Sequence, residues 1–114
     1  MLTVEALKEY GADTGEGLKR CMNNEAFYLR LVKMLDQDTH LDQLGKALEE
    51  KDLDEAFENA HALKGVLANL SLTPVLKPVS EMTELLRTRT DTDYSEWMSA
   101  AQKEMNRLLE LVRS

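Results

Sequence analysis

The amino-acid sequence predicts an all-α protein: an up-down antiparallel four-helix bundle with short extra helices at its N-terminus. Apolar residues recur at spacings of three and four along most of the chain, and no segment shows the alternation typical of a strand. The chain has only five glycines and two prolines, so few residues interrupt helices. The polar breaks between the expected helices are short, which favours antiparallel neighbours.

The first expected helices are short. Thr3 is placed to cap a helix that ends near Gly11, and Asp13 with Glu16 forms a capping-box pattern for the next one. Asn24 precedes a third helix, and Asp38 or Thr39 begins a fourth. On the third helix one stripe is predicted to be buried, and it consists of Phe27, Leu31, Met34 and Leu35.

The longest interior helix is expected over roughly residues 53–70, opened by a second capping-box pattern at Asp52 and Glu55. After a break, Thr73 as N-cap and Pro74 at the first helical position suit the start of another helix. Pro78 is expected to bend that helix or to delay its regular start. A last helix follows Asp93 and carries a stripe of Trp97, Ala101, Met105, Leu108 and Val112.

Length and charge restrict the classes of function. With 114 residues the chain suits a single domain (1–114), in which residues 1–23 form flanking helices and about 24–112 form the bundle. The net charge of -7 argues against nucleic acid and against anionic membrane surfaces. No apolar run approaches the roughly 18 residues of a membrane span, and the first residues do not resemble a signal peptide. The single cysteine, Cys21, forms no internal disulfide, so we expect a cytoplasmic protein.

Two histidines are candidates for chemistry, and their surroundings differ. His40 lies at the polar start of a helix and is interpreted as a solvated helix-end residue. His61 lies in mid-helix, about 100° from the centre of the apolar arc, at the edge of the buried face. Lys64 follows one turn later, where its stem can cover apolar surface while its ammonium group reaches water.

Gly65 is the third notable residue of this segment. A glycine within a helix costs about 1 kcal/mol relative to alanine, so its presence requires a reason. One reason is that it clears the surface beside His61 for another protein. The other is that two helices of the chain pack closely here and that His61 is simply a boundary histidine.

The pattern His61-Ala-Leu-Lys64-Gly65, followed by Ala68-Asn69-Leu70, resembles the signature of histidine-containing phosphotransfer (HPt) domains. The resemblance implies a helical bundle in which His61 accepts a phosphoryl group through Nε2 and Lys64 stabilises its charge. Docking of a receiver domain is then expected at Ala62, Gly65, Ala68 and Asn69. The chain departs from the signature at Ser71, where a glycine is frequent, and at Thr83, where many members have a glutamate that orients the histidine.

The resemblance also implies partners and their chemistry. Thr83 is then a weaker partner for the imidazole, and Arg87 a possible neighbour of the phosphate. Receiver domains of response regulators or hybrid kinases are the expected partners, and they supply Mg²⁺, so the chain itself needs no cofactor. It has no glycine-rich phosphate loop and no ATP-binding domain, so we expect a monomeric carrier without kinase activity.

Two alternatives stay open. Glu58-x-x-His61 matches half of a di-iron motif, but the second half and the additional glutamates are missing. A phosphotransfer-inactive adaptor that binds receiver domains or a kinase is the stronger alternative, because Val66 is bulkier than the small residues that are common there in the family.

Overall fold

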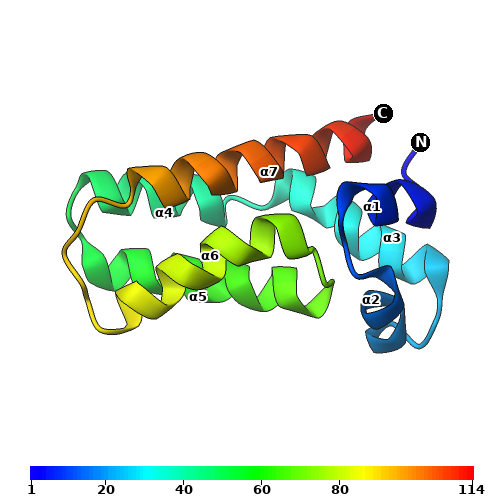
Figure 1. The fold of residues 1–114 in the computed structure, drawn as a ribbon, viewed down its shortest axis with the longest axis horizontal. Coiled ribbons are helices and arrows are strands. Elements are labelled where there is room, and N and C mark those ends of the chain that lie inside the picture. The colour runs from blue at the N-terminus through cyan, green and yellow to red at the C-terminus, as the bar shows by residue number, and fades with distance from the viewer.

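The computed structural model describes all residues from 1 to 114, and they form helices and turns without strands (Figure 1). The predicted all-α class is confirmed. The elements in chain order are α1 (Val4–Tyr10), α2 (Thr14–Arg20), α3 (Glu25–Lys33), the 3-10 helix η1 (Met34–Gln37), α4 (His40–Glu49), α5 (Leu53–Asn69), α6 (Thr73–Arg87) and α7 (Ser95–Arg113).

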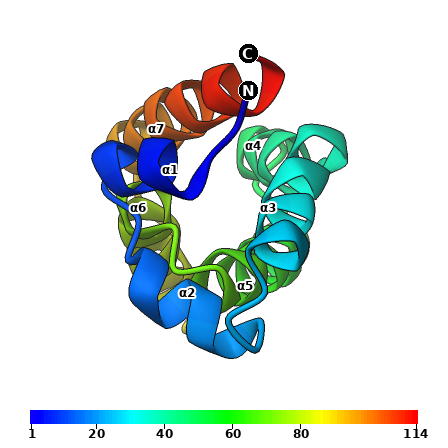
Figure 2. The ribbon, with the colours of Figure 1, turned by 90° about the vertical axis from the view of Figure 1, so that its right-hand side faces the viewer.

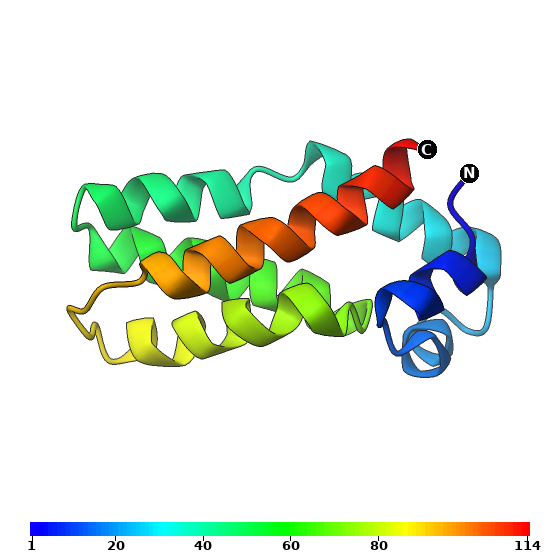
Figure 3. The same cartoon turned by 45° about the horizontal axis from the view of Figure 1, so that its top comes forward.

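Four of these helices, α4 to α7, form an up-down bundle. Their directions alternate, with the α4–α5 and α6–α7 connections at one end and the α5–α6 turn at the other (Figures 1 and 3). The short helices α1, α2 and α3 gather at the end that holds the α5–α6 turn and both termini (Figure 2). One continuous core of 25 buried apolar residues runs through the bundle and these flanking helices.

Side-chain caps define where several helices begin. The side-chain oxygen of each of four predicted N-cap residues accepts a backbone N–H three residues further on. These residues are Thr3, Asp13, Asn24 and Asp52. Each cap satisfies an amide that has no partner inside its helix, so the chain enters the helix at a defined residue. Gly11 ends α1, as predicted, and its φ of 115° places it in the left-handed conformation.

The predicted start of α6 is wrong by one residue. Leu72 is the N-cap, Thr73 is the first helical residue, and no side chain caps this helix. Leu72 is fully buried, so packing rather than capping determines where the helix begins. Of the two effects predicted for Pro78, the delayed start is absent, since the helix is continuous from Thr73 to Arg87.

Met34 is also misplaced by the sequence pattern. It is 62% exposed, whereas Val32 and Leu35 are buried. The buried stripe of this segment consists of Tyr28, Val32 and Leu35, spaced by four and three residues, so the predicted stripe is one residue out of phase. Phe27 and Leu31, which were predicted in the same stripe as Met34, are only half-buried. Met105, which was predicted in the stripe of the last helix, is buried, and so is Met82 on α6.

Polar contacts attach the N-terminal helices to the end of α5. The Tyr28 hydroxyl donates to the Leu70 carbonyl oxygen at 2.8 Å, and burial raises the pKa of Tyr28 to about 12. The Arg20 guanidinium donates to the Ala68 carbonyl oxygen at 3.0 Å and to Ser71 Oγ at 2.7 Å. The bond from Tyr28 satisfies the Leu70 carbonyl, which accepts no backbone N–H, and together these bonds hold α2 and α3 against the end of α5.

Candidate functional site

His61 lies near the middle of α5, on its exposed side. The helix turns this position outward because Ala56, Ala60, Leu63 and Leu67 are all fully buried on the opposite side. No hydrogen bond of the protein involves the imidazole. The ring is instead stacked on Phe57, one turn earlier, with centroids 5.4 Å apart and planes 19° apart. The stacking restrains the ring while its nitrogens stay available to a partner.

An open groove lies on one side of His61, between α5 and the segment that runs from α3 to the start of α4. From α5 it is lined by His61 and by the exposed residues Ala62, Gly65, Val66 and Asn69. The opposite wall is formed by the end of α3, by η1 and by His40. Met34 and Val66, two of the exposed large apolar residues of the protein, both belong to this lining.

Gly65 has an open surface around it. A Cβ atom built at this residue would meet no other atom within 4 Å. Close packing between helices of this chain therefore does not require a glycine here. The bare backbone at Gly65 leaves room there for another molecule to approach the helix.

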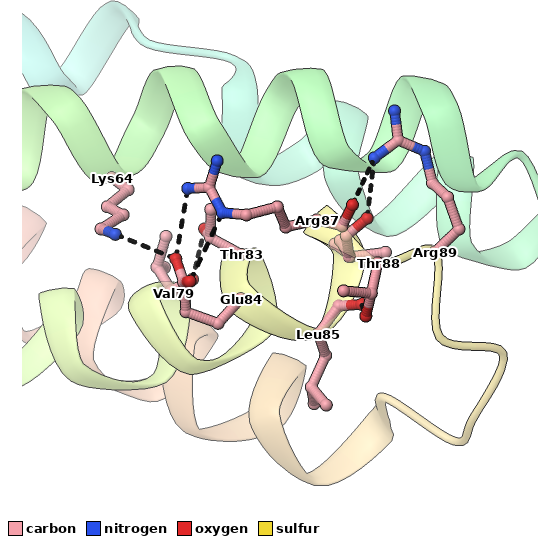
Figure 4. Close-up of polar contacts among 9 residues, drawn as sticks. Lys64, Val79, Thr83, Glu84, Leu85, Arg87, Thr88 and Arg89 are labelled. Carbon is pink, nitrogen blue, oxygen red and sulfur yellow. Dashed lines mark hydrogen bonds and ion pairs between the residues drawn. The ribbon is translucent and has the colours of Figure 1, made fainter.

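A cluster of three charged side chains lies on the other side of His61, away from the groove, where α5 faces α6. Figure 4 shows the contacts among these side chains. Lys64 Nζ lies 3.2 Å from Glu84 Oε2, and Arg87 Nη2 lies 3.2 Å from the same oxygen. Arg87 Nε also donates to Glu84 Oε1 at 3.4 Å. We call Lys64, Glu84 and Arg87 the charged cluster. Hydrogen bonds from Arg87 and then Lys64 hold the pKa of Glu84 below its ordinary value, so the carboxylate is ionised at neutral pH.

Phe57 connects the charged cluster to His61. The Arg87 guanidinium carbon lies 5.4 Å from the centroid of the Phe57 ring, and the Arg89 guanidinium carbon lies 4.7 Å from it. Arg89 is also held by Asp54, with 2.6 Å between Nε and Oδ1. The same Phe57 ring stacks on His61. Two guanidinium groups thus share one aromatic neighbour with the imidazole, at distances typical of cation–π contacts.

The remaining predicted residues are not all at the site. Thr83 is buried, and its hydroxyl donates to the Val79 carbonyl oxygen at 2.7 Å, so the expected hydrogen bond to the imidazole is absent. This bond to the preceding turn is the ordinary alternative for a threonine inside a helix. Ala68 does not line the groove and lies instead where Arg20 contacts α5. Arg87 does belong to the surroundings of His61, through Phe57 and Glu84.

Sequence reasoning missed three contributors. Phe57 is an apolar residue whose spacing along α5 gives no sign of a role at the surface, but it is only half-buried and carries the stacked imidazole. Glu84 gave no signal, because its contact with Lys64 joins residues 20 positions apart on two helices. His40 is not simply solvated: its Nδ1 lies 2.8 Å from Asp38 Oδ1, and it lines the same groove as His61.

The structure offers no support for a metal centre. No group of three or more histidine, cysteine, aspartate or glutamate side chains is placed to hold a metal ion. The half-motif formed by Glu58 and His61 therefore has no further ligands near it. No helix is long and apolar enough to cross a membrane.

Comparison with protein families agrees with this geometry. The model of the family described as "Hpt domain" matches residues 34–113, well over half of the chain. The chain belongs to the Hpt domain family. The resemblance noted in the sequence is thereby confirmed, and the match includes α4 to α7, the charged cluster and all of the groove except the end of α3. Neither the curated proteins nor the solved structures contain a significant match to this chain.

Membership of the family supports a role in phosphotransfer. Hpt domains carry phosphoryl groups in histidine–aspartate phosphorelays, interact there with receiver domains, and have no kinase activity of their own. Residues 1–33, which include α1, α2 and α3, lie outside the matched region.

Proposed function

We propose that this Hpt domain is a phosphorelay intermediate that accepts a phosphoryl group on His61 and passes it to a second receiver domain. The observation that carries the proposal is the exposed mid-helix imidazole, free of hydrogen bonds and stacked on Phe57 between an open groove and a charged cluster. A nucleophile that must meet a partner's phospho-aspartate needs this accessibility. The restrained ring reduces the entropy lost in reaching an in-line geometry.

The transfer step balances in atoms and charge. A neutral imidazole attacks through Nε2, so the Nε2–P bond forms as the P–O bond of the aspartyl phosphate breaks and its electron pair returns to the carboxylate. The ring keeps its Nδ1 proton and takes the positive charge. Neutral imidazole is available near pH 7, because the ordinary pKa of histidine is about 6.5. The second transfer is the reverse reaction with another receiver domain.

Lys64 is proposed to stabilise the phosphoryl group on His61, because it lies one helical turn away on the same side of α5. Its side chain is 31% exposed, so the ammonium group reaches solvent. We propose no cofactor for the chain itself and expect Mg²⁺ to be held by the receiver domain. A monomer in the cytoplasm remains our expectation.

The groove is proposed as part of the surface that receives the partner. Ala62, Gly65 and Asn69 line it beside His61, and Met34 with Val66 gives it apolar character. The net charge of -7 gives no general attraction to the acidic site of a receiver domain, so local apolar contact must supply much of the affinity. Ala68, which was also expected at the docking surface, lies outside the groove and is not part of the surface proposed here.

The proposal is tested by transfer from a phosphorylated receiver domain of the same organism in Mg²⁺ buffer, with His61→Gln as the variant. Intact mass is read promptly and without acid, because phosphohistidine is acid-labile. We expect one added phosphate on the native chain and none on the variant. Transfer that survives in His61→Gln would move the acceptor elsewhere, and receiver binding without any transfer would favour the inactive adaptor.

A further inference from the structure

Glu84 forms ion pairs with Lys64 and Arg87, the two cations of the charged cluster beside His61. Its carboxylate accepts from Lys64 on α5 and from Arg87 on its own helix, and all three side chains reach the solvent (Figure 4). Lys64 is one turn from His61, and Arg87 shares the Phe57 ring with the imidazole. An anion is therefore already bound beside the proposed phosphoryl acceptor, and it belongs to the chain itself.

The charges of the cluster determine what a phosphoryl group would meet. Lys64 and Arg87 carry two positive charges and Glu84 one negative charge, which leaves +1, while the Arg89–Asp54 pair adds no net charge. A phosphoryl group brings about -1.5 to -2 charges and three acceptor oxygens. It is a stronger partner for Lys64 than a single carboxylate is.

The contacts of Glu84 are weak enough to exchange. Its side chain is 57% exposed, and those of Arg87 and Lys64 are 47% and 31% exposed. Exposed ion pairs of this kind contribute little, because water screens the charges and two long side chains must be ordered. Glu84 can thus yield Lys64 to a phosphoryl group without any rearrangement of the helices.

We propose that Glu84 is a positioning residue that competes with the phosphoryl group for Lys64 and Arg87, and so limits how strongly His61 retains that group. This inference rests on the proposed function of His61. In the unphosphorylated chain the carboxylate holds both cations beside the imidazole. When the Nε2–P bond forms, Lys64 moves from Glu84 to the phosphoryl oxygens, and the carboxylate takes Lys64 back when the phosphoryl group leaves. This competition limits the stability of phosphorylated His61, so the phosphoryl group can still be transferred to the second receiver domain.

The experiment compares Glu84→Gln with the native chain in a closed mixture with one phosphorylated receiver domain. The readout is the equilibrium ratio of phosphorylated Hpt domain to phosphorylated receiver. We expect the ratio to rise roughly three- to tenfold in Glu84→Gln, the range that one or two exposed ion pairs provide. Glu84→Asp, which keeps the charge, should stay closer to the native ratio.

Glu81→Gln is the matched control, because it removes the same charge from the same helix. Glu81 accepts from Trp97 Nε1 at 2.9 Å and makes no contact with Lys64. Its ratio should equal that of the native chain. An equal rise in both variants would reduce the effect to net charge and overturn the role of Glu84. A fall in Glu84→Gln would also overturn it, since Glu84 would then only hold Lys64 in place.

A second measurement does not need the receiver. Phosphoramidate, a small-molecule phosphoryl donor, is used to label His61, and the Glu84 carboxyl is titrated by NMR before and after labelling. Loss of Lys64 should move the pKa of Glu84 up towards its ordinary value after labelling. Labelled His61 with an unchanged Glu84 titration and an unchanged ratio overturns this inference alone. Failure of both donors to label His61 overturns the proposed function, and the inference with it.

Discussion

The two sides of His61 are built differently. On the side of α3, η1 and α4 the surface is an open, partly apolar groove. On the side of α6 the surface is polar, and each charged group of the cluster already has a partner within the chain. The exposed apolar side chains of the groove thus have no neighbours to cover them until a partner docks, whereas the charged side chains of the cluster are already paired within the chain. A carrier that must release its cargo needs both, because docking provides specificity and the charges determine retention.

The largest effect is expected from filling the groove. Gly65→Trp places a bulky ring where a Cβ atom now meets nothing, so the isolated chain should fold normally. Phosphotransfer from a receiver domain should fall about 100-fold, because a small misplacement of reacting groups costs that much. The measurement is the initial rate of label transfer to His61, with circular dichroism as the check on folding.

Lys103→Trp is the control for this change, since Lys103 is an exposed residue of α7 outside the groove. It should transfer at the native rate. If Gly65→Trp also accepted label at the native rate, the partner would have to approach His61 from the side of the charged cluster. Docking would then belong to that side and not to the groove.

An intermediate effect, on stability, is expected from the hydrogen bond that holds α3, part of the groove wall, against the end of α5. Tyr28→Phe removes the hydroxyl that joins α3 to the Leu70 carbonyl, and the unpaired carbonyl should lower the free energy of unfolding by about 1–2 kcal/mol. The measurement is urea unfolding at neutral pH. An unchanged midpoint would show that α3 needs no such anchor.

Alkaline pH tests the same hydroxyl through its ionisation. An unfolded tyrosine ionises near pH 10, whereas burial raises the pKa of Tyr28 to about 12 in the folded protein. The unfolded state therefore loses this proton first, and the stabilisation that is complete below pH 10 is lost as the pH rises towards 12. Tyr28→Phe should show a shallower alkaline decline in the free energy of unfolding than the native chain. Equal slopes would contradict the assignment.

The smallest effect separates docking from packing at Gly65. Gly65→Ala should raise the free energy of unfolding by about 1 kcal/mol, because alanine is the better helix former and its Cβ atom meets nothing. The measurement is thermal or urea unfolding, and transfer from the receiver domain is followed in parallel. A loss of stability would show that the glycine serves packing within the chain.

The sequence predicted the helices better than their surroundings. The caps at Thr3, Asp13 and Asn24 were predictable because each depends on residues three positions apart. The start of α6 was not, since the buried Leu72 outweighs the capping preference of Thr73. Met34 was misplaced because Phe27, Leu31 and Met34 are spaced as regularly in the sequence as the stripe that is buried, and only packing shows which of the two faces the core.

At the site, too, the sequence predicted what depends on neighbouring residues and missed what depends on packing between helices. His61, Lys64 and Gly65 stand within five residues of one helix, so their order on its surface follows from helical periodicity alone. Glu84 and Arg87 lie on another helix, and their approach to Lys64 and Phe57 depends on how α5 and α6 are rotated against each other. Side-chain packing across the whole interface sets that rotation.

The sequence by itself therefore determined a helical bundle with a histidine in the middle of its longest interior helix, at the edge of the buried face, because these properties arise from local spacing and short-range hydrogen bonds. Only the tertiary structure decided that a carboxylate from α6 holds Lys64 and that η1 closes a groove beside His61. These contacts join residues far apart in the chain, and their geometry is defined only when the core has packed.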